Sequence, residues 1–333
     1  AVYRPATAAW INSIGCDKLK SRWKNIDGKK VDQTKQWTPA GYGLYFERKI
    51  TAMKGSTITI DAPVVHAMDS KFGGGAIFKY EANDRLAEVG IENLRLMSEF
   101  AKPVPGNPYG DPKQTTRSEK HGWNAIKLGR NTENTWVRNV TGNYFGWSLV
   151  SASGKRATVQ DCVNLVHASQ ITGGRRYPFM IDVQLNLMQR CVTVEGRHEF
   201  VNQARTPGPN VFVDCIGFKS KSSAGPHHRY SVGNLYDNVK NENIMESRFR
   251  GNSGTGHGWA GTQTCFYNCV ARGFSVGAPP GGISWVIGSG KKDAKGIRVS
   301  PASLYYAQVE ERLGKDAVER LAGREQRENI GKY

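Results

Sequence analysis

Histidine and arginine side chains recur together in the glycine- and proline-rich stretches in the middle of this chain. His227, His228 and Arg229 are consecutive, and His198 and His257 lie in neighbouring stretches of the same kind. A neutral histidine accepts protons near neutral pH, and an adjacent arginine stabilises negative charge that develops on a substrate. These residue types therefore predict proton transfer at an anionic substrate.

The arginines also show a regular spacing. Three of them follow a cysteine by 14 residues: Arg176 after Cys162, Arg205 after Cys191 and Arg229 after Cys215. If the intervening turns match, these arginines share one face and can pair bidentately with carboxylates. The competing interpretation is that insertions of different length scatter them, or that nearby aspartates neutralise them.

Metal binding is the competing use of the histidines. His227, His228 and His257 could act as ligands, but the sequence has no His-Glu-x-x-His spacing that would support zinc. We therefore predict a site without a metal.

The cysteines belong to an internal repeat. Similar phrases place either Cys or Asn between apolar residues, at Asn93, Asn139, Cys162, Cys191, Cys215, Asn238 and Cys269. The spacing is 23 to 31 residues, if the gap of 46 residues after Asn93 is read as two turns of 23. Short β-branched strands with this period predict a parallel β-helix. We expect the Cys and Asn side chains to stack inside it, the thiols to be free, and the sequon at Asn139 to be unused.

The ends of the chain lack this repeat. We assign residues 1–85 to an N-terminal cap, 86–295 to the β-helix and 296–333 to a C-terminal helix and tail. Alternation on both sides of residues 54–56 predicts a β-hairpin, and a cap would protect an open end of the solenoid. Ser300 and Pro301 resemble the start of a helix, whose apolar positions continue to Leu321.

Composition narrows the choice of partner. The 333 residues carry 46 Lys and Arg against 29 Asp and Glu, a formal net charge of +17. Such a surplus predicts a polyanionic partner. The chain has no zinc-finger spacing and no RNP-like aromatic motif, and no apolar run of the roughly 18–20 residues that a membrane span needs. We therefore expect an acidic polysaccharide rather than nucleic acid or a membrane.

The repeat, together with residues 225–230 (Gly-Pro-His-His-Arg-Tyr) and 256–261 (Gly-His-Gly-Trp-Ala-Gly), resembles bacterial proteins of the pectate-lyase-like right-handed β-helix superfamily. The resemblance covers roughly residues 85–290. It implies an all-β, right-handed parallel solenoid. Hydrolases, lyases, epimerases and adhesins share this scaffold, so the fold alone does not fix the reaction.

The activity that the resemblance implies is a polysaccharide lyase. A base removes the C5 proton of a uronic acid, a cation neutralises its carboxylate, and the 4-linked sugar leaves by β-elimination. We expect His228 or His198 as the base and Tyr230 as a proton donor. Arg229 is the expected catalytic cation, and the expected substrate-binding residues are Arg175, Arg176, Arg205, His227, His257 and Trp259. No cluster of acidic residues accompanies them, so the sequence departs from the calcium-dependent pattern and no cofactor is expected.

Two other functions stay open. A hydrolase would need two carboxylates about 5–10 Å apart, for which the candidates are Asp161, Asp182, Glu199, Asp214 and Asp237. A non-catalytic adhesin would stack sugars on Trp123, Trp136, Trp147 and Trp259. The class of fold suggests a secreted or periplasmic protein, while the oligomeric state is left open.

Overall fold

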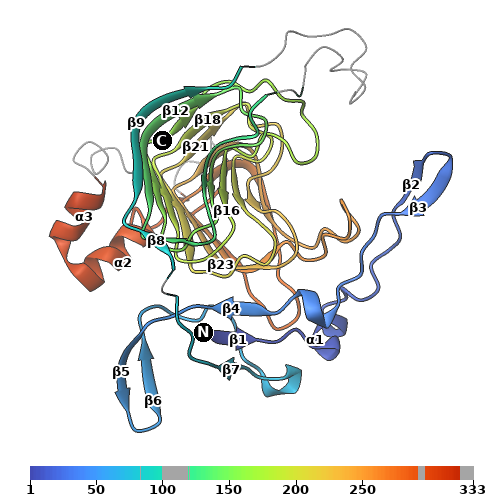
Figure 1. Ribbon diagram of the computed structural model, residues 1–333, viewed down its shortest axis with the longest axis vertical. Helices are drawn as coiled ribbons and strands as arrows, with labels where there is room; N and C mark the ends of the chain where they lie inside the picture. The colour runs from blue at the N-terminus through green and yellow to red at the C-terminus, as the bar shows by residue number, and fades with distance from the viewer. Residues whose placement is uncertain (83, 100–118, 120, 292–296, 323–333) are drawn as a thin grey trace.

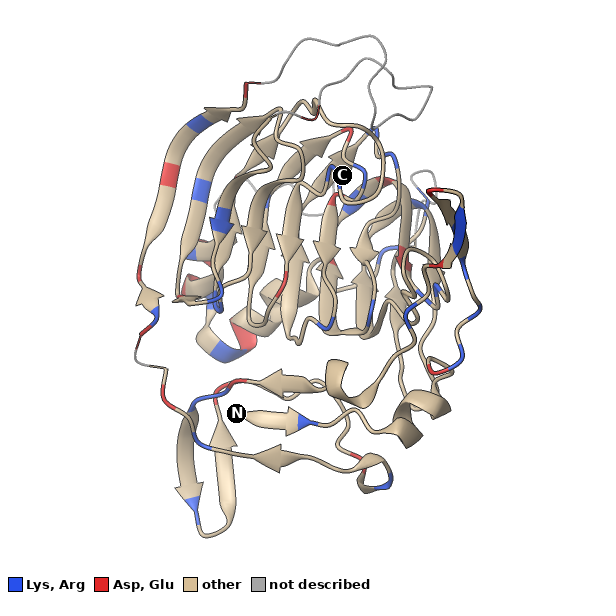
Figure 2. Ribbon diagram, turned by 45° about the vertical axis from the view of Figure 1, so that its right-hand side comes forward, with Lys and Arg blue, Asp and Glu red and all other residues tan. Residues whose placement is uncertain are grey.

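Short parallel strands stack coil upon coil in the computed structural model, which describes all residues except 83, 100–118, 120, 292–296 and 323–333. The strands of successive coils lie side by side (Figure 2). One sheet has the order β10-β13-β16-β19-β22, and a larger sheet joins the other solenoid strands from β9 to β27 except β11, which pairs with β8. The predicted all-β parallel solenoid is confirmed.

Each coil contributes strands to these sheets in chain order. They are β8 (Leu86–Ala87) and β9 (Gly90–Met97); β10 (Asn124–Leu128), β11 (Thr132–Glu133) and β12 (Trp136–Asn143); β13 (Ser148–Ala152), β14 (Thr158–Gln160) and β15 (Val163–Asn164); β16 (Phe179–Ile181), β17 (Leu187–Gln189) and β18 (Val192–Val194); β19 (Phe200–Asn202), β20 (Asn210–Val213) and β21 (Ile216–Phe218); β22 (Gly225–Pro226), β23 (Ser231–Asp237) and β24 (Lys240–Ser247); β25 (Gly261–Tyr267) and β26 (Val270–Val276); and β27 (Trp285–Ile287).

The cysteines and asparagines of the repeat do not share one position. Strand register pairs Gln160 with Gln189 and Val163 with Val192, which stacks Cys162 on Cys191 inside the tube. The asparagines stand one residue earlier, at a corner with positive φ that recurs in successive coils, at Asn93, Asn139, Asp161, Arg190, Asp214, Asn238 and Asn268. Asn and Asp tolerate this left-handed conformation better than most residues. The predicted interior stack is therefore confirmed for the cysteines and wrong for the asparagines.

The asparagines at the N-terminal end of the solenoid lie on its surface. Asn93 and Asn139 are both exposed, and the Asn139 amide donates to the Asn93 side chain at 2.8 Å. Because β9 pairs directly with β12, the offset of 46 residues from Asn93 to Asn139 corresponds to one coil rather than two turns of 23. All six cysteines are free thiols, as expected.

The first 82 residues form a lobe along the flank of the solenoid, beneath the row of coils in Figure 2. It comprises β1 (Val2–Arg4), α1 (Ala8–Ser13), β2 (Trp23–Ile26), β3 (Lys29–Asp32), η1 (Pro39–Gly41), β4 (Leu44–Phe46), β5 (Ile50–Lys54), β6 (Thr57–Ile60), η2 (Ser70–Phe72) and β7 (Ala76–Ile77). The predicted hairpin is β5–β6, which turns at Gly55. A second hairpin, β2–β3, turns at Asp27-Gly28, a pair that favours tight hairpins.

This lobe contacts several coils instead of covering one open end. The Arg48 guanidinium donates to Gln184 and to the Gly208 carbonyl, and the Trp259 indole donates to the Ile14 carbonyl. A shared apolar core joins Trp10 and other lobe residues to Tyr230 and Val232 of the solenoid. The lobe therefore packs along several coils of the solenoid.

Two short helices near the C-terminal end of the described chain cover Asp214 and Asp237. Helix α2 (Leu304–Leu313) and helix α3 (Lys315–Ala322) are separated at Gly314, where one continuous helix was expected. Ser303, not Ser300, caps α2, and its hydroxyl donates to Asp237 at 2.6 Å. The Tyr306 hydroxyl donates to Asp214 at 3.0 Å.

Asp237 makes this docking sensitive to pH. Burial raises the pKa of its carboxyl from 3.8 to about 7. A raised pKa means that the folded state holds this proton more tightly than the unfolded state does. The contribution of Asp237 to the unfolding free energy is therefore greatest below about pH 4 and is lost as the pH rises through about 7.

Asp237→Asn should remove this loss, since the amide is neutral and keeps an oxygen for the Ser303 hydroxyl and the Tyr305 N–H. At about pH 8 the variant should exceed the wild type by a few kcal/mol in unfolding free energy, at about 1.4 kcal/mol per pKa unit. Near pH 4 the two should be equal. Urea unfolding at both pH values measures this, and a difference that does not depend on pH would refute it.

Candidate functional site

Four histidines from successive coils meet beside the edge of the β13-β16-β19-β22 sheet, and we call them the histidine cluster: His198, His227, His228 and His257. The ring centroids of His198 and His227 are 4.5 Å apart, and those of His227 and His228 are 4.9 Å apart. His257 lies 5.2 Å from His227 and 5.0 Å from His228. The structure thus brings together the four histidines that the sequence singled out.

All four rings are neutral at neutral pH. Burial, with the neighbouring arginines and histidines, lowers the pKa values of His228 and His257 to about 3. The same causes hold the pKa values of His198 and His227 well below 6.5. His198 and His227 are buried, while His228 and His257 keep partial exposure. The cluster therefore presents unprotonated nitrogens among fixed positive charges.

Hydrogen bonds fix the tautomer of His227. Its Nδ1 lies 3.0 Å from Nη1 of Arg250, and arginine can only donate. Nδ1 is therefore the acceptor, so the proton of the neutral ring is on Nε2, which lies 3.2 Å from the Tyr177 hydroxyl. Arg197 donates to the same hydroxyl oxygen at 3.0 Å. Because the phenol oxygen accepts two hydrogen bonds, its own proton is directed elsewhere.

His198 is fixed in the opposite tautomer. Its Nδ1 lies 2.6 Å from the Ser223 carbonyl oxygen, which can only accept, so Nδ1 carries the proton. Its Nε2 is buried without a hydrogen-bond partner among the described residues. Glu246 supports both histidines, because it accepts from the Ser223 hydroxyl at 2.7 Å and lies 3.7 Å from Nε of Arg250.

A row of aromatic rings leads along the coils to the cluster. The ring centroids of Trp123 and Trp147 are 6.2 Å apart, as are those of Trp147 and Tyr177. The centroid of Tyr177 lies 4.9 Å from that of His198. The Trp123 ring is 38% exposed, and the Arg175 guanidinium lies 5.3 Å from its centroid. Aromatic faces with a polar partner suit sugar rings, whose faces are apolar and whose edges are polar.

The predicted column of three arginines is only partly present. The Arg205 N–H donates to the Arg229 carbonyl at 2.8 Å, so these two occupy adjacent coils at one position. Arg176 instead aligns with Arg197, because the Arg197 N–H donates to the Arg176 carbonyl at 2.7 Å. The Arg176 side chain is buried and binds the Ser169 carbonyl at 2.7 Å. Arg176 therefore holds backbone and does not face a substrate.

The other predicted residues divide between the site and the lobe. Tyr230 lies in the core shared with the lobe, where burial raises the pKa of its hydroxyl, and His66 bonds that hydroxyl at 3.1 Å. Trp259 is tied to the lobe through Ile14. Arg175 pairs with Glu119 at 2.8 Å, near the outer end of the aromatic row.

Four of the five carboxylates proposed for a hydrolase are engaged in structural contacts, and the fifth, Glu199, is buried with neither carboxylate oxygen hydrogen-bonded to a described residue. Arg190 binds Asp161 with both nitrogens, at 2.6 and 2.7 Å, and Arg130 lies 3.2 Å from Asp182. Asp214 and Asp237 lie under α2, and Glu199 is buried. Burial raises the pKa of Glu199 to about 8.

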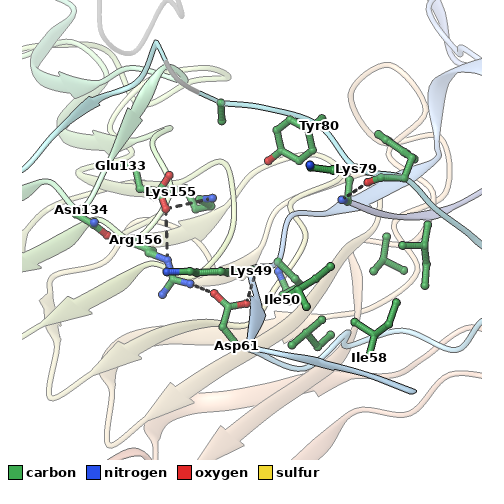
Figure 3. Close-up of a pocket in the computed structure, with 17 residues that line it drawn as sticks. Lys49, Ile50, Ile58, Asp61, Lys79, Tyr80, Glu133, Asn134, Lys155 and Arg156 are labelled. Atoms are coloured by element: carbon green, nitrogen blue, oxygen red, sulfur yellow. Dashed lines mark hydrogen bonds and ion pairs between the residues drawn. The ribbon is translucent and has the colours of Figure 1, made fainter. Parts of the chain in front are cut away.

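A separate cavity of about 890 Å³ lies between the lobe and the coils (Figure 3). Its apolar wall includes Ile50 and Ile58 of the β5–β6 hairpin. Two of its cations are already neutralised, since Arg156 pairs with Asp61, and Lys155 lies 3.2 Å from Glu133. The cavity therefore resembles an interface between lobe and solenoid more than a site for an acidic ligand.

The described residues contain neither a cluster of metal-ligating side chains nor a membrane-spanning helix. No group of three or more His, Cys, Asp or Glu side chains in this part of the chain is placed to hold a metal ion. No helix within the same residues is long and apolar enough to cross a membrane.

Sequence reasoning missed Tyr177, Arg197, Arg250 and Glu246. Arg197 directly precedes His198, and Arg250 directly precedes the glycine-rich residues that lead to His257. A count of 14 residues from each cysteine selected Arg176 and passed over Arg197. This count fails because the turns differ in length from coil to coil.

Comparison with known protein families, with curated proteins and with solved structures finds no match for this chain.

Proposed function

We propose that the protein is a polysaccharide lyase of the pectate-lyase-like kind and that the histidine cluster is its catalytic centre. One observation carries the proposal: unprotonated histidines and fixed guanidinium groups occupy the same place, with the Glu246 carboxylate beside them. β-Elimination from a uronic acid needs both, since a base must take the C5 proton while a cation stabilises the charge that develops on the carboxylate.

The partly exposed rings would contact the sugar. His228 is the proposed base, with His257 beside it, and Arg197, Arg229 and Arg250 are the proposed partners of the uronate carboxylate. A bound carboxylate would raise the low pKa of His228, which makes the ring a stronger base only when substrate is present. His198 would serve as a positioning residue, because its Nδ1 proton is held by the Ser223 carbonyl oxygen.

Tyr177 is the proposed proton donor to the departing sugar oxygen. Its oxygen accepts from Arg197 and His227, so its own proton is not used in either of these hydrogen bonds. In this role Tyr177 replaces Tyr230, whose hydroxyl faces the lobe. The row from Trp123 through Trp147 would support further sugar units on the way to the centre.

The test is a panel of polyuronates, sulfated glycosaminoglycans and neutral polysaccharides. A lyase forms a carbon–carbon double bond conjugated with the carboxylate, which absorbs in the ultraviolet. We expect that absorbance with at least one uronic-acid polymer and with no neutral polymer. New reducing ends without the absorbance would indicate a hydrolase, and binding without cleavage would indicate an adhesin. Either result would overturn the lyase proposal.

A further inference from the structure

The β2–β3 hairpin projects from the molecule as an arm, which we define as residues 18–35 (Figure 1). Every residue from 20 to 32 is exposed, and the Trp23 side chain is 62% exposed. At about 3.4 Å per residue the strands carry the tip roughly 25 Å from the base. An isolated two-stranded hairpin is only marginally stable in water, so the base of the arm must fix it.

Side-chain and backbone contacts close that base. Asp32 accepts the N–H groups of Arg22 at 3.0 Å and Thr34 at 2.8 Å. The Gln36 amide exchanges two hydrogen bonds with the Leu19 backbone, at 2.7 and 2.8 Å. The arm is thus ordered at its root while its faces remain open to solvent.

The arm concentrates positive charge. It holds seven Lys and Arg against two Asp, a net charge of +5 in eighteen residues, where the whole chain of 333 residues has +17. No ion pair of the described residues includes a side chain of the arm. Elsewhere many cations are paired with acids, so this charge is available to a partner.

Both faces of the arm mix cations with apolar side chains. Register places Lys24 opposite Val31 and Ile26 opposite Lys29 on one face. On the other face, Trp23 stands opposite Asp32 and Lys30 opposite Asn25. An exposed aromatic ring on an arm that carries several lysines suits a sugar chain with carboxylates, because the ring covers the apolar face of a sugar while the ammonium groups meet the charge.

The base of the arm is bound to the loop that carries part of the histidine cluster. Arg22 donates to the Gly254 carbonyl at 3.1 Å, and the Asn252 amide donates to the Ser21 carbonyl at 3.1 Å. The same loop holds Arg250 and His257, and the charge of Arg22 contributes to the lowered pKa of His257. A polymer that reaches the cluster can therefore continue onto the arm.

We propose that the β2–β3 arm binds an anionic polysaccharide beyond the histidine cluster, so that the protein prefers long polymers to short oligomers; the choice of polysaccharide rests on the proposed function. Continuity with the cluster favours this partner over nucleic acid, which would use the arm's charge without need of the cluster.

Binding to immobilised polygalacturonate and alginate at several salt concentrations tests the arm. The arm variant is Lys24→Gln, Lys29→Gln and Lys30→Gln together. The control is Lys54→Gln, Lys71→Gln and Lys315→Gln, three exposed lysines elsewhere, which gives the same net charge. We expect the arm variant to lower the salt slope of polymer affinity by about three and the affinity by about tenfold or more. The control should stay near wild type, and affinity for a disaccharide should be unchanged in both.

Equal affinities of the arm and control variants would overturn the proposal. Tighter, arm-dependent binding of duplex DNA than of either polyuronate would overturn the choice of polysaccharide. Polyuronate binding that depends on the arm but occurs without cleavage would support the arm and count against the lyase, so the two failures are distinguishable.

Discussion

Replacing His228 by glutamine should lower kcat/KM on a uronic-acid polymer by about 10²- to 10⁴-fold, the contribution expected of a general base. Glutamine keeps much of the size and polarity of the imidazole but cannot take a proton. Partial exposure of His228 limits the packing cost. Steady-state kinetics on the polymer that the panel identifies measures the effect, with thermal unfolding as the check on folding.

His66→Gln is the matched control. Burial also lowers the pKa of His66, to about 4, but this ring lies in the lobe and bonds Tyr230. Its substitution should cost stability and leave kcat/KM within a small factor of wild type. Equal losses in the two variants would show that His228 acts only through folding.

Tyr177→Phe should reduce kcat by about 10²-fold or more while KM changes little, because the hydroxyl acts on the leaving group and not in substrate binding. Removing it also leaves Nη1 of Arg197 and Nε2 of His227 without their shared acceptor. Measuring kcat and KM separately over a range of pH distinguishes this role, since loss of a proton donor removes one limb of the pH profile.

Tyr236→Phe is the matched control for Tyr177→Phe. The Tyr236 hydroxyl is fully buried and donates to Asn202 at 2.7 Å, inside the tube. Its loss should lower stability by about 1 kcal/mol and leave the pH profile unchanged. A Tyr177→Phe enzyme with wild-type kcat would remove Tyr177 from the mechanism.

The repeat predicted the solenoid because stacking places equivalent residues of each coil at one position. It failed in detail where the chain turns a corner. Cys162 and Asn139 occupy similar phrases, yet Asn139 stands at the left-handed corner and Cys162 one residue further along, inside the tube. An apolar-polar-apolar pattern alone does not distinguish these neighbours, since both fit between the same β-branched residues.

The histidine cluster could be predicted because its members lie in equivalent stretches of successive coils. The arginines beside it could not be chosen in the same way. A guanidinium reaches several ångströms from its backbone, and small differences in turn length decide whether it meets a ring or a carbonyl. Thus Arg250 contacts His227, whereas Arg176, which the regular spacing favoured, is buried against the Ser169 carbonyl.

The lobe was the least predictable part. Its hairpins are local features with turn residues that identify them, but its packing joins residues more than 200 positions apart, such as Ile14 and Trp259. For that reason Tyr230, a plausible proton donor beside two histidines in sequence, lies against Trp10 and Trp37 in the lobe core.

The most direct test of the histidine cluster as a lyase centre is the ratio of double bonds formed to new reducing ends released from a purified polyuronate. β-Elimination breaks the glycosidic bond without water and leaves one double bond at each new non-reducing end. We predict a ratio of one for the wild type and a loss of both signals together in the His228→Gln variant. New reducing ends released without double bonds would contradict the account.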